Sequence, residues 1–171
     1  MGRACKRIRS ALPHSGGRVV RLVDIVSKEK RASMMASVRQ KNTRPEVLLR
    51  QALHRLGLRF RIHRRDLPGT PDIVLPSHRT VIFVHGCFWH RHEGCRRTTL
   101  PATKTAFWAD KFSKNVERDR KVQKALITLN WRVVVIWECQ LSTLGSASAL
   151  AESFFRTLRR KSSRSKRLTA R

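Results

Sequence analysis

Residues 84–95, in the middle of the chain, hold two cysteines and three histidines within twelve positions. Cys87, His92 and Cys95 are spaced to close a loop around one ion. Cys139, which follows a separate apolar run, could supply a fourth ligand across a sheet. Three cysteines and one histidine form a standard closed tetrahedral set for Zn²⁺. Buried free cysteines are the alternative, but the polar, histidine-rich surroundings favour a structural zinc site.

If His92 binds zinc, the other two histidines of this segment, His85 and His90, remain free for chemistry. A neutral imidazole can take a proton from water and an imidazolium can return one. Two histidines beside a metal-bound water could therefore be a general base and a general acid. A histidine with a purely structural hydrogen bond is the alternative, and spacing alone leaves both open.

A carboxylate, Asp72, opens the first of two β-branched runs at 72–75 and 80–84, and a short polar segment separates them. This pattern predicts a hairpin. The start of one hairpin strand lies beside the end of the next, so Asp72 is expected near Val84 and His85. A carboxylate and a backbone carbonyl suit Mg²⁺, which can polarise a phosphate and activate water for phosphodiester hydrolysis. A lone Pro–Asp pair is more often a simple turn.

Two pairs of aromatic residues accompany these segments. Phe88 and Trp89 lie inside the histidine-rich segment, and Phe107 and Trp108 open an expected helix. Exposed aromatic side chains in a basic protein can stack on bases or wedge into a duplex. Core packing is the alternative, and composition alone favours it.

The surrounding sequence predicts the elements that position these residues. Thr43 suits a helix N-cap, Pro45 the first turn, and Glu46 stands three residues after the cap. Apolar residues then recur at helical spacing until Gly57. The predicted order is α-α-β-β-β-α-β-α, a mixed α/β domain with one central sheet. Its helices are expected at 28–38, 44–56, 106–128 and 146–160, and its strands at 60–62, 72–75, 80–84 and 131–137.

The chain of 171 residues has 38 lysines and arginines against 11 acidic residues, for a net charge of +27. This charge argues against an ordinary small-molecule enzyme and favours a polyanionic partner, with nucleic acid the first candidate. Residues 1–23 contain six basic residues and residues 156–171 contain eight, without any acid. Both tails are poor in large apolar residues, so we expect them to be disordered without a partner. They can attract phosphate non-specifically, or simply aid solubility.

The ordered domain is expected at 24–160, between an N-terminal basic extension at 1–23 and a C-terminal basic tail at 161–171. The N-terminus lacks the apolar stretch of a secretory signal. No apolar run approaches the ~18 residues that a membrane span needs. We therefore expect an intracellular protein that has no contact with a membrane.

Several motifs follow one another along the chain: Pro71-Asp72, His85-Gly86-Cys87-Phe88-Trp89-His90, residues 101–105, Phe107-Trp108, residues 114–119, 131–133 and 137–139. Together they resemble the very short patch repair (Vsr) endonucleases, over about residues 24–141. The resemblance implies a restriction-endonuclease-like α/β core, with a central mixed sheet flanked by helices. It also implies a bacterial DNA mismatch endonuclease that nicks on the 5′ side of the thymine in T:G mismatches, which arise when 5-methylcytosine deaminates. Members of the family use Mg²⁺ for catalysis and hold a structural zinc ion.

The resemblance also implies catalytic and metal-binding residues. Asp72 looks like the carboxylate ligand of Mg²⁺, with the main-chain carbonyl of Val84 as its companion. His90 resembles the general base. His85 and Glu46 look like the groups that hydrogen-bond metal-bound water and phosphate. The structural zinc ligands of the family are matched by Cys87, His92, Cys95 and Cys139.

A second set of residues resembles the DNA-contacting groups of the family. Phe88, Trp89 and Trp108 resemble an aromatic wedge that is inserted beside the mismatch. Met35 resembles a smaller wedge from the opposite groove. Lys111 and Asn115, four residues apart on one helix face, resemble the pair that reads the mismatched bases. The expected partner is double-stranded DNA with a T:G mismatch, bound by a monomer in the bacterial cytoplasm and nucleoid, with repair proteins as possible further partners.

Two features depart from familiar patterns. Residues 83–85 supply neither the second acid nor the lysine of the wider nuclease superfamily, an absence that the Vsr subgroup shares. The stretch from His92 to Cys95 is one residue longer than the familiar family pattern, which affects the expected geometry of the zinc loop. Two alternatives stay open: a related nuclease with relaxed mismatch or sequence specificity, and a zinc-containing DNA-binding module without catalysis.

Overall fold

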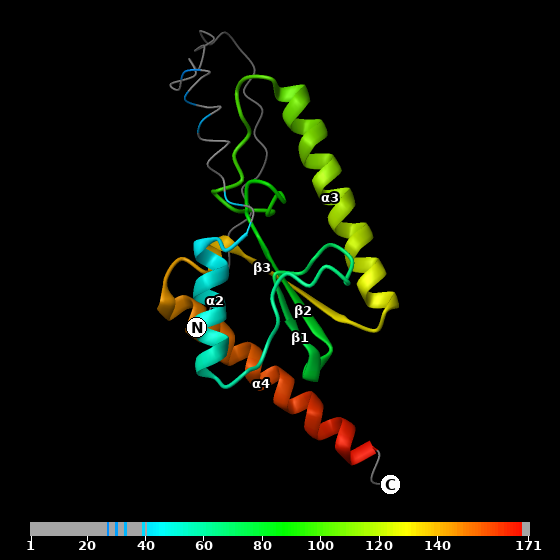
Figure 1. The fold of residues 1–171 in the computed structure, drawn as a ribbon. Coiled ribbons are helices and arrows are strands. Elements are labelled where there is room, and N and C mark those ends of the chain that lie inside the picture. Colours follow the sequence, from blue (N-terminus) through cyan, green and yellow to red (C-terminus); the bar gives the residue numbers. More distant parts are fainter. Residues whose placement is uncertain (1–26, 28–29, 31–32, 34–38, 40, 169–171) are drawn as a thin grey trace.

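The computed structural model describes residues 27, 30, 33, 39 and 41–168 (Figure 1). The elements within them are α2 (Arg44–Arg55), β1 (Ile73–Leu75), the 3-10 helix η1 (Pro76–His78), β2 (Thr80–His85), α3 (Thr105–Thr128), β3 (Arg132–Trp137), the 3-10 helix η2 (Glu138–Gln140) and α4 (Leu144–Leu168). The predicted helix at 28–38 lies largely outside the described residues, although Lys30 and Ser33 are helical. Met35 is also outside them. Within the described part of the chain, none of the helices has the length and apolar character needed to cross a membrane.

The three strands form one mixed sheet in the order β1-β2-β3. β1 and β2 pair antiparallel, as the hairpin prediction requires, and Ile73 lies opposite Ile82. β3 pairs parallel to β2, so α3 is the crossover that parallel neighbours need. The carboxyl ends of β2 and β3 therefore meet at one edge of the sheet, with His85 opposite Trp137. The predicted α/β class and central mixed sheet flanked by helices are confirmed.

Alternation along the strands divides the core into two layers. Ile73, Leu75 and Ile82 face α2 and α4, and Val74, Val81 and Phe83 face α3. The fully buried Leu53 of α2 and Leu126 of α3 contact the two opposite faces. Burying each such side chain contributes about 1.5–3 kcal/mol. Figure 1 shows the result, with α3 on one side of the sheet and α2 and α4 on the other.

Two sequence predictions about the elements are wrong. Residues 60–62 form no strand, because only Arg61 pairs with the sheet, in an isolated bridge to Val74. The backbone turns away at His63, whose φ of 47° ends an extended run. The last helix runs beyond the predicted end at 160, to Leu168, so most of the C-terminal basic tail is helical rather than disordered. Arginine and lysine are good helix formers, and they let α4 continue after its apolar contacts end.

Candidate active site

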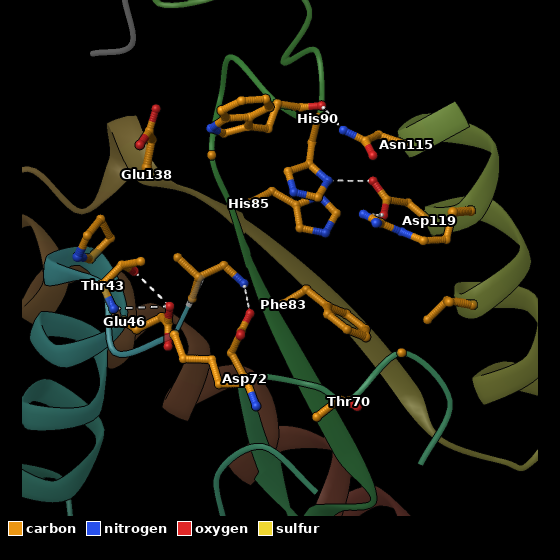
Figure 2. Close-up of a pocket in the computed structure, with 18 of the residues that line it drawn as sticks. Thr43, Glu46, Thr70, Asp72, Phe83, His85, His90, Asn115, Asp119 and Glu138 are labelled. Atoms are coloured by element: carbon orange, nitrogen blue, oxygen red, sulfur yellow. Dashed lines mark hydrogen bonds and ion pairs between the residues drawn. The ribbon is translucent and has the colours of Figure 1, made fainter. Parts of the chain in front are cut away.

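A cavity of about 760 Å³ opens at the edge of the sheet where β2 ends (Figure 2). Its walls come from the first turn of α2, from the start of β1 and the end of β2, and from one face of α3. It brings together eight of the residues predicted from the sequence: Glu46, Asp72, Val84, His85, Trp89, His90, Lys111 and Asn115. Among these eight residues, Glu46 and Asn115 lie 69 positions apart in the chain, and both line one space.

Asp72 lies immediately before β1, and the hairpin register brings it to the end of β2. Its Oδ2 accepts a hydrogen bond of 2.8 Å from the backbone N–H of Val84, so the predicted proximity is confirmed. The pKa of Asp72 is raised to about 6, chiefly by burial and also by the nearby charge of Glu46, against the lowering effect of that hydrogen bond. A desolvated carboxylate of this kind gains most when a cation neutralises it.

His85 and His90 stack on each other beside Asp72, with ring centroids 3.9 Å apart and an interplanar angle of 15°. Burial, and after it the neighbouring His90, lowers the pKa of His85 to about 4. His90 Nδ1 lies 2.5 Å from Asp119 Oδ2. A dashed line marks this contact in Figure 2. When Nδ1 donates this bond, Nε2 is left as the free acceptor of a proton. In this geometry the Asp119 carboxylate orients the ring of His90.

The sequence analysis missed the role of Asp119. Burial raises the pKa of this carboxyl, but the hydrogen bond and charge of His90 outweigh burial and lower it. A signal was present, since Lys111, Asn115 and Asp119 are spaced four apart and share one face of α3. The amide of Asn115 also donates to the carbonyl oxygen of Trp89 at 3.2 Å. This face of α3 therefore holds the histidine-rich segment against the cavity.

Glu46 lies in the first turn of α2 and is almost fully buried. Its carboxylate accepts hydrogen bonds from the backbone N–H and the hydroxyl of Thr43, at 3.2 and 2.8 Å, so the predicted helix start is confirmed. Arg50, one turn later, forms an ion pair with it at 2.6 Å. Glu46 therefore has a fixed place beside Asp72, and its charge is compensated within α2.

His63 is a second residue that the sequence analysis missed. It has no regular spacing to the other site residues, and it reaches the cavity from the irregular segment between α2 and β1. Its ring lies between two carboxylates, with Nε2 3.7 Å from Glu46 and Nδ1 4.0 Å from Asp72. Burial and then the charge of Arg50 lower its pKa. Glu46, His63 and Asp72 offer atoms within 4.8 Å of one another.

The predicted zinc ligands converge at the same edge of the sheet, beyond the cavity. One ligand atom from each of Cys87, His92, Cys95 and Cys139 lies within 4.8 Å of the others. His92 Nδ1 is 3.4 Å from both Cys87 Sγ and Cys139 Sγ. A tetrahedral site with Zn–S of about 2.3 Å and Zn–N of about 2.0 Å requires N···S of about 3.5 Å. The residues therefore fit zinc, and the three cysteines are free thiols without a disulfide.

The aromatic residues of the histidine-rich segment and of the first turns of α3 form a cluster that is separate from the main core. Phe88 packs edge-on against Trp89, Trp108 and Phe112, with centroid distances between 5.1 and 5.6 Å. Phe88, Trp89 and Trp108 remain partly exposed, and Phe107 is 58% exposed. The cluster thus presents aromatic surface next to the cavity, which the core-packing alternative does not explain.

Comparison with known proteins decides the family. The family model described as "DNA mismatch endonuclease Vsr" matches residues 23–97. The type II nicking enzyme V.XorIIP of Xanthomonas oryzae pv. oryzae is 52% identical over 128 residues, which cover 75% of this chain and 93% of that protein. DNA mismatch endonuclease Vsr of Escherichia coli K12 is 44% identical over 120 residues, which cover 70% of this chain and 76% of that protein. The chain belongs to the Vsr family.

This Vsr-family chain is therefore an endonuclease, and DNA is its partner. A further relative, the type II nicking enzyme V.NmeAIP of Neisseria meningitidis, is 42% identical over 120 residues, covering 70% of this chain and 85% of that protein. The family match at 23–97 includes Asp72, His85 and His90. It also includes three of the four residues that could hold zinc, namely Cys87, His92 and Cys95. The remaining contributors, Asp119 and Cys139, come from α3 and η2.

Proposed function

We propose that this Vsr-family endonuclease nicks duplex DNA on the 5′ side of the thymine in a T:G mismatch, by Mg²⁺-dependent hydrolysis on a restriction-endonuclease-like core. One observation carries the proposal: the partly buried carboxylate Asp72 and the hydrogen-bonded pair His90–Asp119 line the same cavity. This hydrolysis requires a carboxylate that binds a cation and a group that accepts the proton of water. A strongly basic surface supplies the affinity for DNA. The name of the relative in Escherichia coli supports a mismatch as the substrate.

The residues fit a cation ligated by oxygen. Asp72 and the main-chain carbonyl of Val84 would hold Mg²⁺, which usually takes few protein ligands and keeps several waters. Bound there, Mg²⁺ supplies polarisation of the phosphate and a lower pKa for water. Glu46 and His85 lie in the same cavity and can hydrogen-bond such waters or a phosphate oxygen.

The proton of the attacking water goes to His90. Its Nδ1 is engaged with Asp119 at 2.5 Å, so Nε2 accepts the proton, and the Asp119 carboxylate stabilises the imidazolium that results. A positioned general base contributes typically 10²–10⁴-fold. His85 stays neutral at physiological pH because its pKa is lowered to about 4, so it can donate a hydrogen bond without adding charge beside the cation.

The aromatic cluster and the adjacent face of α3 are proposed to recognise the mismatch. Phe88, Trp89 and Trp108 would enter the stack where it is weakest, since unstacking a step costs a few kcal/mol and costs least at a mismatch. Lys111 and Asn115 line the cavity beside them, and they would then contact the mismatched bases. Met35 would enter from the opposite groove. The cysteine and histidine cluster would hold Zn²⁺ and brace the segment that carries these aromatics.

End-labelled duplexes test the proposal. One carries a single T:G mismatch and the other its T:A parent, in several sequence contexts, and both are incubated with the protein and Mg²⁺. We expect a nick 5′ of the mismatched thymine that is absent from the T:A duplex and absent for Asp72→Ala. Cutting of both duplexes would instead support a nuclease of relaxed specificity. Binding without cutting in every context, also with Mn²⁺, would support a DNA-binding module that lacks catalysis.

A further inference from the structure

His63 has a position that the proposed chemistry does not yet use. Its ring lies between two carboxylates of the cavity, with Glu46 on one side and Asp72 on the other. Only 14% of its side-chain surface is exposed. The segment that carries it is anchored two residues earlier, where Arg61 and Val74 exchange backbone hydrogen bonds of 2.8 and 2.7 Å.

The contact with Arg50 decides which ring nitrogen of His63 carries the proton. Arg50 Nη2 lies 3.1 Å from His63 Nε2. A guanidinium can only donate, so Nε2 is the acceptor and the ring proton sits on Nδ1. Arg50 is itself held by Glu46 at 2.6 Å and by Asn42 Oδ1 at 2.6 Å. The tautomer is therefore set by a network within and beside α2.

Nδ1 of His63 faces Asp72 Oδ1 at 4.0 Å. The other oxygen of Asp72, Oδ2, already accepts from the backbone N–H of Val84. A separation of 4.0 Å exceeds a direct hydrogen bond, so the Asp72 carboxylate would have to turn towards Nδ1 to accept one. With one donor at each oxygen, the plane of this carboxylate would then be fixed.

We propose that His63 is a positioning residue that orients the Asp72 carboxylate for a divalent cation through Nδ1–H. The proposal rests on the cation-binding role assigned to Asp72 in the proposed function. Groups that orient a metal ligand from behind typically change metal affinity or activity by 10–100-fold when they are lost. Direct ligation by His63 is disfavoured because the lone pair of Nε2 is used by Arg50 and Nδ1 carries the proton.

Three substitutions separate this role from simple packing. His63→Ala removes both ring nitrogens. His63→Asn puts an amide N–H near the position of Nδ1, whereas His63→Gln puts its amide near Nε2. If His63 positions Asp72, asparagine should rescue cation binding and glutamine should not. If His63 merely supports Arg50, glutamine should be the better substitute. His54→Ala is the matched control, because His54 is an exposed histidine on α2 whose ring contacts Arg59.

The first measurement uses the full chain and Mn²⁺ alone, with free Mn²⁺ followed by electron paramagnetic resonance. We expect His63→Ala to weaken Mn²⁺ binding about tenfold or more, His63→Asn to recover most of it, and His54→Ala to match the wild type. Equal Mn²⁺ affinity of His63→Ala and the wild type would overturn the proposal. So would rescue by glutamine but not by asparagine.

The second measurement is the tautomer itself, from long-range ¹H–¹⁵N spectra of the protein labelled at histidine, with the His63 signals assigned by their loss in His63→Asn. We expect the proton on Nδ1, and a proton on Nε2 would contradict the assignment. Both measurements are independent of cleavage. If the wild type binds Mn²⁺ but does not nick DNA, the proposed function is wrong, and the Mn²⁺ affinities of the variants still test the positioning role of His63. If nicking is normal and His63→Ala leaves its Mg²⁺ requirement unchanged, only the inference about His63 fails.

Discussion

Asp72 has to be charged to bind a cation, yet it lies where charge is unfavourable. Only 19% of its side-chain surface is exposed, and burial raises its pKa to about 6. The folded chain without cation therefore keeps a carboxylate whose ionisation opposes stability. This is a common property of functional carboxylates, because the site is built for the bound ligand rather than for the empty fold.

This property predicts the pH dependence of stability. The folded pKa of Asp72, about 6, lies above its ordinary value of 3.8, so the free energy of unfolding should fall as the pH rises from about 4 to about 6. Asp72→Asn keeps a hydrogen-bond acceptor and removes the titration. Without divalent cation, we expect it to exceed the wild type in stability by about 2–3 kcal/mol at pH 7.5. Urea unfolding should show this gain shrinking towards pH 5, and a gain independent of pH would count against the explanation.

Asp119 should act on catalysis through His90 rather than on the fold. Asp119→Asn keeps the size of the side chain, but its amide can no longer stabilise the imidazolium. Since a positioned base contributes about 10²–10⁴-fold, we expect kcat to fall by about 10² or more, with little change in KM for the duplex. Single-turnover nicking with saturating protein measures the loss, and a rate equal to that of the wild type would exclude the role.

At the scale of elements, the hairpin and its consequence for Asp72 followed from strand patterning alone. Cys139 was expected to supply a fourth ligand across the sheet, but the parallel pairing of β2 and β3 that brings it to Cys87 is visible only in the structure. The spacing of Asp119 places it on the helix face of Lys111 and Asn115, but no local pattern says that this face meets His90. His63 could not be found from spacing, since an irregular segment and a left-handed residue bring it to the cavity. Local patterns predict elements, whereas contacts made by loops depend on the assembled fold.

The turn before β1 depends on a glycine that touches α3. Gly69 has a φ of +71°, and a Cβ there would lie 2.4 Å from Val122 Cγ1. Gly57 has a similar φ of +76° with nothing within 4 Å of a Cβ, so it is the matched control. We expect Gly57→Ala to lower the free energy of unfolding by about 1 kcal/mol, from backbone strain alone, and Gly69→Ala to lower it by clearly more. Thermal and urea unfolding measure the difference. Equal losses for the two variants would show that Val122 of α3 can move away from the added Cβ without a loss of stability.

The clustered cysteines should make stability depend on zinc. Cys87 and Cys139 follow β2 and β3, so a shared ion would tie the ends of two strands together. We expect the purified protein to contain about one zinc per chain by elemental analysis, since a closed set takes a single ion. Removal by a strong chelator, or the change Cys139→Ser, should lower Tm and increase exposure of the aromatic cluster to quenchers. A zinc-free protein with the same Tm would refute a structural ion.

For the whole molecule, the dominant property is the charge of +27. Counterion release then supplies much of the affinity for DNA and makes it strongly dependent on salt. Residues 161–171 contribute five of the basic residues. Deleting them should reduce the slope of log K against log salt by as much as about 4, at about 0.9 for each phosphate contact. Fluorescence anisotropy with a T:A duplex between 50 and 300 mM salt measures the slope, and an unchanged slope would show that this segment makes no phosphate contact.

The most direct test of the account separates binding from chemistry at the cavity. Wild type and Asp72→Ala are compared on one T:G duplex, with Kd measured in Ca²⁺ and the nicking rate measured in Mg²⁺. The account predicts that Asp72→Ala keeps a Kd within a few-fold of the wild type, because DNA is held by the basic surface and the aromatics, while its nicking falls below detection. A parallel loss of binding and nicking, or continued nicking without Asp72, would contradict the assignment of this cavity as the catalytic centre.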